Sequence, residues 1–392
     1  MNTQNTPVHI TLWHKGFWLL SLANLFVTMS VYALLPVMPQ WLMCYEHFSP
    51  FYTGLSMGAF AFGLFAFGTF CSYLVQRFRR NAVCIRAILI MALLIAAIYY
   101  LHDNHITMID VWAIIGQRFL LGATFGLAKM VLSSTLIVDT SESFQRTEAN
   151  HSSSWFARFA LSLGPLLGIV VNHIWGFGAV LVMCVALCLL AVVLIRMVDF
   201  PFRAPEENVT LFSLDRFFLK SGTLLFVNLF IITVAIGLIM SVELSFTFYG
   251  MIMFGFFLAL LAQRFVFINA ELKSEVVTGL ILVFTALLLM VTRHAVVVNY
   301  AAPTMIGLGV GIVGARFLLF FIKLSRHCQR GTSQSTYILG WESGIALGVG
   351  IGYAFFSGNE QLALIFSLSL VSVALALYIL VTHSWFVNHK NR

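Results

Sequence analysis

The chain is a succession of long apolar runs separated by short polar connectors. The runs are continuous rather than alternating, and each approaches the roughly 20 residues that a helix needs to cross the hydrocarbon core of a bilayer. Backbone groups in lipid must pair within their own segment, so continuous runs favour helices over a closed barrel. The pattern predicts twelve spans, at about 16–38, 51–75, 82–101, 109–137, 152–174, 177–198, 218–237, 240–264, 275–292, 300–324, 336–357 and 361–384.

The composition agrees with a membrane protein. Hydrophobic residues make up 60% of the chain and charged residues only 9%, whereas a soluble domain has roughly 25% charged residues. The first span is too long for a signal peptide and lacks a small-residue cleavage site, so we expect an uncleaved anchor. We therefore expect an all-α integral protein of the inner or plasma membrane of the cell.

The net charge of +7 invites a nucleic-acid interpretation. The position of the charges argues against it. With a cytoplasmic N-terminus, almost all Lys and Arg residues fall on the inner side of the membrane, and Arg293 is the exception. This bias predicts that both termini are cytoplasmic. The expected partners of the basic residues are lipid headgroups rather than nucleic acid.

Metal, cofactor and enzyme chemistry have weak support in the sequence. Cys184 and Cys188 are one helical turn apart with no His or acid beside them, so we expect packing rather than a metal site. No Gly-rich nucleotide loop is present, so no cofactor is expected and a gradient must supply the energy. His102-Asp103 and His105 are the only candidates for a catalytic cluster, and a short exposed loop favours simple solvation.

The chain divides into two similar halves. The longest polar connector runs from Asp199 to Arg216, which predicts bundles at 1–198 and 218–392 joined by a cytoplasmic linker at 199–217. Four echoes relate equivalent spans: Gln76-Arg77-Phe78 with Gln263-Arg264-Phe265, Asn24 with Asn228, GQRFLL from Gly116 with GARFLL from Gly314, and Trp155 with Trp341. Two parallel six-helix repeats around an axis along the membrane normal are typical of secondary transporters.

Three motifs carry a family resemblance. The loop after the second span reads Ser72 to Asn81, and its first Arg and basic finish are similar to a signature of the major facilitator superfamily, without its glycines and Asp. Span four carries Arg118, Gly122 and Gly126, and span five carries Gly164-Pro165-Leu166-Leu167-Gly168. Over essentially its whole length the chain resembles this superfamily, and through span five it resembles the drug and sugar efflux branch. The resemblance implies a monomeric alternating-access carrier whose spans one, four, seven and ten line the pathway.

The resemblance also implies a gate at the inner face. Gln76, Arg77 and Arg80 occupy the loop after span two, and Asp139 and Arg146 match the acid and Arg usual after span four. Asp139 is expected to pair with Arg77 or Arg80. Gly164, Pro165 and Gly168 are expected to give either a tight contact between spans five and eight or an ordinary bend.

The altered loop gives a first testable prediction. In the family, the resemblance implies, the loop Asp docks onto the other half and holds one access state, and Gln76 keeps its shape without its charge. We expect Gln76→Asp to shift crosslinking between the halves towards the outward-open form. An unchanged crosslinking pattern would count against this interpretation.

Charges within the spans are the strongest site candidates. Arg118, Lys129 and Arg316 each cost about 2.5–3.5 kcal/mol at a helix centre, so each should face a wet cavity or a partner. Arg118 and Lys129 share a helical face, and Arg316 is expected to join them by repeat symmetry. Together they predict a positive substrate cavity. The alternative is that the arginines tie helices together and that Lys129 extends towards the cytoplasm.

Polar groups on other spans complete the prediction. Asn24 and Asn228 suit either a polar substrate or helix–helix hydrogen bonds, and Tyr32 lies near the outer end of span one. Glu243, one turn inside span eight, is the candidate proton-coupling group. Glu342 is expected to start span eleven near the inner gate, where an acid suits the helix dipole.

These observations favour secondary active transport of a small molecule by alternating access. The preferred version is proton-coupled efflux of an amphipathic or sugar-like compound, because Phe and Met suit a permissive apolar cavity. The alternative is an importer or exchanger of a small organic anion that uses the positive cavity. A transport-dead sensor and a membrane enzyme are the distant alternatives.

Overall fold

The computed structural model describes residues 11–104, 110–142, 144–200, 210–242, 245–268, 270–293, 295–326 and 329–391. Within these ranges, eleven helices are long and apolar enough to cross a membrane, and a bent pair raises the total to twelve. The predicted all-α architecture of about twelve spans is confirmed. The bent pair joins Pro50–Ala66 and Cys71–Arg77 at 53° and corresponds to the second predicted span.

The helices of the N-terminal half follow one another with short connectors. They are α1 (Lys15–Tyr32), α2 (Leu34–Cys44), α3 (Pro50–Ala66), α4 (Cys71–Arg77), α5 (Arg80–Asp103), α6 (Val111–Val131), α7 (Ile137–Asp139), α8 (Arg146–Trp175) and α9 (Phe177–Arg196). A π-helical turn, Leu132–Leu136, joins α6 to α7. Local chemistry starts two of these helices: Ser49 caps α3 ahead of Pro50, and Gly176, at φ 83°, separates α8 from α9.

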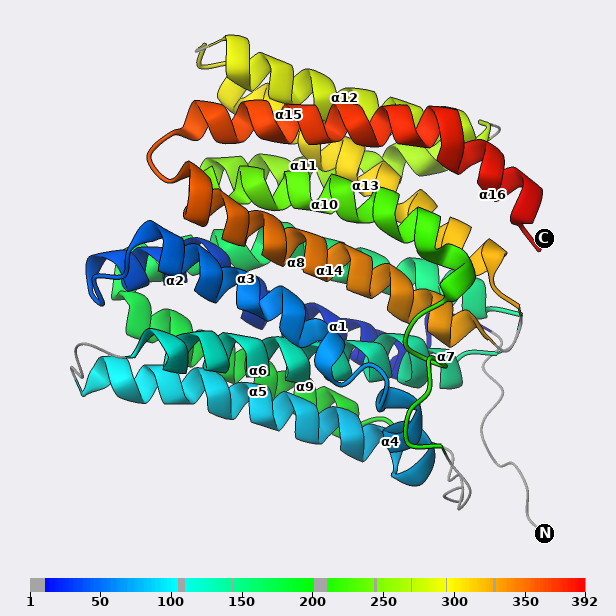
Figure 1. Ribbon diagram of the computed structural model, residues 1–392. Helices are drawn as coiled ribbons and strands as arrows, with labels where there is room; N and C mark the ends of the chain where they lie inside the picture. The colour runs from blue at the N-terminus through cyan, green and yellow to red at the C-terminus, as the bar shows by residue number, and fades with distance from the viewer. Residues whose placement is uncertain are drawn as a thin grey trace.

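The C-terminal half repeats the pattern. Its helices are α10 (Thr223–Val242), α11 (Phe246–Phe265), α12 (Leu272–Thr292), α13 (Val298–Leu324), α14 (Arg330–Phe356), α15 (Glu360–Leu377) and α16 (His383–His389). A π-helical turn, Tyr378–Thr382, continues α15 into α16. In Figure 1, α7 and α16 lie at the same end of the bundle, called here the terminal end, and α14 runs through the middle of the molecule. The start of α1 lies at this end too, since His14 contacts the Thr140 carbonyl beside α7.

The internal echoes hold in part. Gln76-Arg77 and Gln263-Arg264-Phe265 both fall at helix ends, those of α4 and α11, as predicted. The echo between Arg118 and Arg316 does not mark equivalent depths. Arg118 lies in the second turn of α6, whereas Arg316 lies close to the C-terminal end of α13. The similar sequences GQRFLL and GARFLL therefore lie at different depths in their two helices.

The halves meet closely at both ends of the bundle. Away from the termini, α3 packs on α14 through glycines: a Cβ at Gly54 would lie 2.4 Å from the carbonyl oxygen of Gly350. At the terminal end, Gly331 of α14 approaches Ser134, where a Cβ would lie 3.1 Å from the Ser134 oxygen. Only residues without side-chain bulk allow such backbone contact between helices. The structure is therefore a closed state.

The described part of the linker, with the residues that follow it, joins this terminal end to both halves. Its Ser213 amide donates to the carbonyl of Thr69 in the N-terminal half at 3.0 Å. On the other side, the Arg216 amide donates to Thr332 at 2.8 Å and the Leu219 amide to Thr336 at 2.8 Å. These contacts hold the connector against the terminal end of the bundle. The sequence identifies this connector only as polar.

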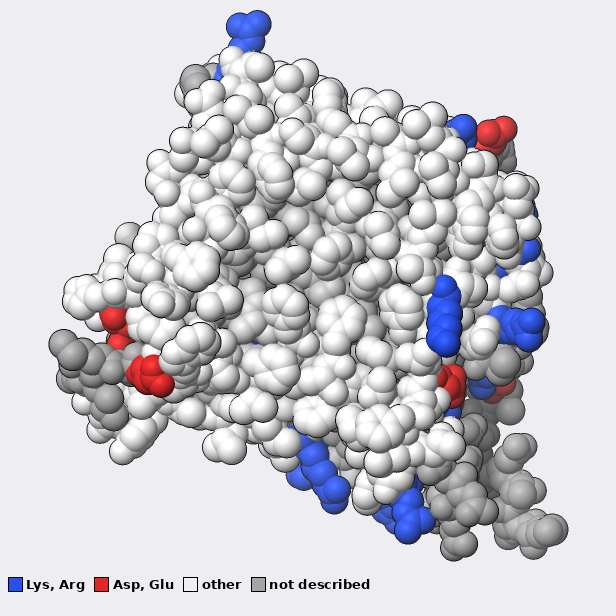
Figure 2. Space-filling view, in the orientation of Figure 1, with Lys and Arg blue, Asp and Glu red and all other residues white. Residues whose placement is uncertain are grey.

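The surface has the charge distribution of a membrane protein. Figure 2 shows a broad uncharged area across the middle of one face, with most Lys, Arg, Asp and Glu near the two ends. Exposed apolar side chains of the membrane-spanning helices include Phe62, Leu93 and Phe257. Lipid is the environment in which such a surface is stable.

The glycine contact between α3 and α14 gives a second prediction. Gly54→Ala should hold the halves apart at the end away from the termini, because the new Cβ meets backbone atoms rather than a flexible side chain. Spin labels at Tyr52 and Phe355, in a cysteine-free background, should report a longer distance. Gly116→Ala on α6 is the control, since a Cβ there meets nothing within 4 Å. Equal distances in both variants would contradict this seal.

Candidate functional site

A polar cavity lies between the halves. Its lining comes from α1, α6, the π-helical turn and α8 on one side and from α14 on the other: Asn24, Lys129, Ser133, Ser154, Ala157, Arg158, Gln334, Tyr337, Ile338, Trp341 and Glu342. The cavity measures about 20 Å³, which is room for about one water molecule. In this closed state a cargo molecule has no room, so the halves must part to admit it.

Lys129 is held by α1. Its Nζ donates to Asn24 Oδ1 at 2.8 Å and to Thr28 Oγ1 at 2.8 Å. The Asn24 amide nitrogen in turn donates to the carbonyl of Ser153 on α8 at 3.3 Å. The side chain of Lys129 is only 1% exposed, so these neutral partners do not balance its charge. Its counter-ion comes from the other half of the molecule.

Glu342 of α14 is that counter-ion. Its Oε1 lies 3.8 Å from Lys129 Nζ, and its Oε2 accepts a hydrogen bond from the Tyr32 hydroxyl at 2.7 Å. The acid belongs to the C-terminal half, while Lys129 and Tyr32 belong to the N-terminal half. Any motion that separates the halves must therefore break or stretch a buried ion pair, whose separate members are costly to bury.

Tyr32 is placed by close helix packing. It is the last residue of α1, and α8 approaches it at Gly164, where a Cβ would lie 2.7 Å from the Cβ of Tyr32. Gly168 lies equally close to the next residue, since a Cβ there would be 2.2 Å from the carbonyl oxygen of Ala33. The glycines of α8 therefore allow close packing against the end of α1 and so position Tyr32, whose hydroxyl donates to Glu342.

Arg158 contributes a second cation to the cavity. Its Nη2 donates to Ser154 Oγ at 3.0 Å and lies 3.5 Å from the Tyr337 hydroxyl of α14. The guanidinium carbon lies 4.6 Å from the centre of the Trp155 ring, a cation–π contact. Nε and Nη1 have no hydrogen-bond partner among the residues that the structure describes. Arg158 is 1% exposed.

The helix that carries Lys129 changes its winding directly after it. The π-helical turn Leu132–Leu136 brings Ser133 to the cavity wall. Such turns within α-helices are frequent at functional sites, because they rotate the side chains that follow. The π-helical turn therefore lies beside the cavity, and it includes Ser134, which Gly331 approaches where the halves meet at the terminal end.

The structure brings together only part of the predicted substrate site. Asn24 and Lys129 line the cavity, and Tyr32 is one hydrogen bond away from it. Arg118 does not line it: the buried guanidinium faces α3, 5.5 Å from the centre of the Phe60 ring. Gly122 faces the same helix, with its Cβ position 2.2 Å from the Phe60 oxygen. The expectation of one cationic face on span four therefore holds for Lys129 and not for Arg118.

Two further candidates serve their own half instead. Arg316 Nε lies 2.5 Å from Glu275 Oε2 of α12, and Asn228 donates to the Ala374 carbonyl at 3.2 Å and to Thr382 at 3.3 Å. Both side chains join helices within the C-terminal half. Repeat symmetry predicted a cavity position for Arg316, and the offset in depth described above explains the error.

The inner-gate predictions have mixed outcomes. The predicted pairing of Asp139 is confirmed, because Arg80 Nη1 donates to Asp139 Oδ2. Arg77 is exposed and Gln76 half-buried at the end of α4, and Arg146 begins α8.

The predicted contact between spans five and eight is not made by the Gly-Pro motif. Gly164 and Gly168 face Tyr32 and Ala33 instead. The contact with span eight comes from Ser162, whose Oγ donates to the Tyr249 carbonyl at 2.5 Å.

The two predicted carboxylates have different outcomes. Glu342 caps nothing: α14 begins at Arg330, so Glu342 lies in mid-helix and is 6% exposed. The helix-dipole interpretation is wrong because the span starts six residues earlier than hydropathy indicates. Glu243, the predicted proton-coupling residue, and His105 of the outer loop lie outside the described residues.

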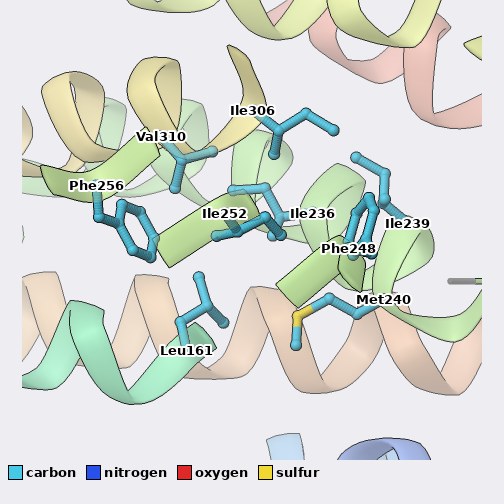
Figure 3. A pocket seen from close by; sticks show the side chains of 9 residues that line it. All are labelled: Leu161, Ile236, Ile239, Met240, Phe248, Ile252, Phe256, Ile306 and Val310. Carbon is cyan, nitrogen blue, oxygen red and sulfur yellow. The ribbon is translucent and has the colours of Figure 1, made fainter. Parts of the chain in front are cut away.

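An apolar contact closes the bundle beyond the polar cavity. Figure 3 shows apolar side chains without nitrogen or oxygen around a gap, among them Leu161 of α8, which points toward Phe256 and Ile252 of α11. The gap measures about 10 Å³. Leu161 belongs to the N-terminal half and its neighbours to the C-terminal half. Apolar side chains pressed together in this way exclude water and ions. The gap is therefore part of a seal rather than a binding site.

Among the cavity residues that the sequence analysis did not propose are Arg158, Tyr337 and Trp341. Arg158 lies well inside the predicted fifth span, and a charge at that depth is a signal that could have found it. Trp341 and Trp155 were noted as an internal echo, and both lie beside Arg158 in space. Tyr337 has no distinguishing feature in the sequence.

A bundle of about twelve spans with a buried ion pair across two halves has the architecture of a secondary transporter. The sequence matches the profile of the Major Facilitator Superfamily over residues 20–349, and the chain belongs to this family. It is therefore a secondary active transporter of a small molecule and not an enzyme.

Solved structures share the fold at low sequence identity. The peptide transporter PepTSo of the POT family superposes with a TM-score of 0.72 at 11% identity, covering 96% of this chain and 99% of that one. The human organic anion transporter MFSD10 (TETRAN) gives 0.68 at 14%, covering 93% and 98%. A mutant of the nucleoside transporter NupG gives 0.67 at 11%, covering 93% and 99%. A search of curated protein sequences finds no match.

Proposed function

We propose that this transporter is coupled to protons and that Glu342 is the coupling carboxylate. The observation that supports the proposal is the ion pair between Glu342 of one half and Lys129 of the other, buried in the cavity between them. A coupling group must change its charge balance as the halves move. A carboxylate whose cation belongs to the opposite half meets that requirement directly.

The coupling follows from the cost of a lone buried charge. When the halves part, Glu342 moves away from both Lys129 and Tyr32, while Lys129 keeps Asn24 and Thr28 of its own half. A carboxylate that loses a nearby cation binds protons more readily. Protonation then removes the uncompensated charge and permits the reorientation. Tyr337 and Arg158 are the other titratable or charged groups that line the same cavity.

The direction of transport is proposed from the sequence. The Gly-Pro motif of α8 resembles that of efflux permeases, and proton-coupled efflux of an amphipathic or sugar-like compound follows from that resemblance. Support for cytoplasmic termini comes from the Lys and Arg side chains near the terminal end.

Counterflow in proteoliposomes tests this function. The purified chain is reconstituted and loaded with one solute of a panel that includes neutral and anionic compounds, and uptake of the labelled solute is followed. Flux of at least one solute should respond to an imposed pH gradient and lose that response with a protonophore. Flux that ignores the pH gradient contradicts proton coupling. The complete absence of flux across the panel would favour the transport-dead sensor.

A further inference from the structure

Arg158 is a buried cation with no counter-ion among the residues that the structure describes. The cavity lining contains two cations, Lys129 and Arg158, and one acid, Glu342. Glu342 is already engaged by Lys129 and Tyr32, and the partners of Arg158 are two neutral hydroxyl groups. An uncompensated buried charge is strongly unfavourable. The described part of the cavity therefore carries a surplus positive charge that an anion would balance.

The surroundings of Arg158 fix its orientation. Trp155 covers the guanidinium at 4.6 Å, and Ser154 and Tyr337 hold Nη2. On α13, Gly314 leaves the space that the side chain needs, because a Cβ there would lie 3.0 Å from Arg158 Nε. The donors on Nε and Nη1 are thus pre-positioned and without partners. A pre-organised guanidinium loses little entropy when it binds an acid group.

An aromatic wall stands next to these donors. Tyr337 and Trp341 both line the cavity, with ring centres 5.9 Å apart and planes inclined by 31°. The same Cβ position at Gly314 would also lie 2.8 Å from the Trp341 ring. The Trp341 ring and the Arg158 side chain therefore both pack against Gly314. Aromatic faces favour flat apolar partners in offset or edge-to-face contact.

We infer that the substrate is a small organic anion with a planar apolar body, whose acid group binds Arg158 while the flat part lies against Trp341 and Tyr337. This inference rests on the proposed function of the same cavity. The inference adds one step to the proposed coupling, because a substrate acid group in this cavity also approaches Lys129. Glu342 then loses its cation to the substrate and takes up a proton, so anion and proton cross the membrane together.

Binding by the full chain in nanodiscs tests the inference without any need for transport. The ligands are 4-hydroxybenzoate, its uncharged amide and acetate, and the readouts are tryptophan fluorescence, which Trp155 and Trp341 supply at the site, and thermal stability. We expect 4-hydroxybenzoate to bind at least about tenfold more tightly than either comparison compound, since one charge-assisted contact is worth that factor.

Variants assign the effect to Arg158. Arg158→Gln should weaken 4-hydroxybenzoate at least about tenfold, and Arg158→Lys should restore part of the affinity. Arg118→Gln is the matched control, because Arg118 is an equally buried arginine that faces α3; it should leave affinity unchanged. The unliganded thermal stability of each variant separates loss of binding from loss of folding.

The outcomes are distinct. Equal affinity for the amide and the acid, or equal losses in the Arg158 and Arg118 variants, would overturn the inference. A failure to bind 4-hydroxybenzoate together with pH-dependent counterflow of a neutral solute would overturn the substrate class and leave proton coupling intact. Tight binding of the acid together with flux that ignores the pH gradient would support the substrate class and remove the proposed coupling.

Discussion

Glu342→Gln should abolish uphill transport while substrate exchange at equilibrium continues. The amide keeps the size of the side chain and can still accept a hydrogen bond from Tyr32, but it neither gains nor loses a proton. A carrier that reorients only with its coupling site neutral is then free to exchange substrate and unable to use a pH gradient. We expect accumulation to fall to the level of protein-free liposomes and counterflow to continue.

The control for this variant is Glu275→Gln. Glu275 is the other buried acid among the residues that the structure describes, and it pairs with Arg316 inside the C-terminal half. Its loss should lower stability without uncoupling transport, because that pair does not cross between the halves. If Glu342→Gln accumulates substrate as the parent does, or if both variants uncouple, the coupling role assigned to Glu342 is wrong.

The second large effect concerns stability. Lys129→Met leaves Glu342 as an unpaired buried acid, and the removal of one partner from a buried pair costs about 3–5 kcal/mol. The double variant Lys129→Met with Glu342→Leu removes both charges. It should recover most of that loss, because an apolar pair of similar volume is often as stable as the ion pair it replaces. The double variant should nevertheless be unable to couple transport to protons.

Thermal unfolding of the purified variants in detergent measures this effect. We expect a large fall in Tm for Lys129→Met and a Tm near the parent value for the double variant. Asp139→Asn removes the partner of Arg80 in a pair that is more exposed than Lys129 and Glu342. It should change Tm much less, as exposed pairs contribute about 0–1 kcal/mol. Losses that simply add in the double variant would mean that Lys129 and Glu342 do not interact.

Hydropathy predicted the fold because the membrane imposes one strong rule on every span. The long apolar runs became helices, the second of them a bent pair. The rule failed locally at α14. Its first turns contain Thr332, Ser333, Gln334, Ser335 and Thr336, all of them buried. Polar side chains packed inside a bundle are invisible to a hydropathy window, so the helix start was placed six residues late.

That local failure explains the misjudged role of Glu342. A helix that starts at residue 336 puts the acid in its first turns, where a dipole role is reasonable. With the start at Arg330, the same residue moves into the middle of the bundle and faces Lys129. Span depth, rather than residue type, decided the interpretation. Arg316 failed for the related reason that similar sequences do not guarantee similar depth, whereas Arg118 failed because its side chain faces α3 rather than the cavity.

Other parts of the site required three-dimensional information. Lys129, Asn24 and Tyr32 could be proposed from single spans, because a polar group in hydrocarbon needs a partner. Which helix supplies the partner depends on packing, and α14 meets the N-terminal half through its glycine contacts with α3 as well as through Glu342. The sequence therefore predicted the members of the N-terminal half better than their counterpart.

The inferred anion also bears on direction. Efflux by exchange with protons moves cargo and proton oppositely, whereas displacement of Glu342 from Lys129 by a substrate acid moves them together. Exchange of substrate with protons is proposed from the motif in α8, whereas movement of substrate and proton together is proposed from the residues of the cavity. The sign of the pH change during transport separates them.

The most direct test records the internal pH of proteoliposomes with a trapped dye while the solute with the fastest counterflow is added outside. If Glu342 couples transport to protons, the internal pH should change with solute uptake in the parent chain. No such change should occur in Glu342→Gln, after subtraction of the signal from protein-free liposomes. Solute uptake by the parent chain at constant internal pH would contradict this coupling.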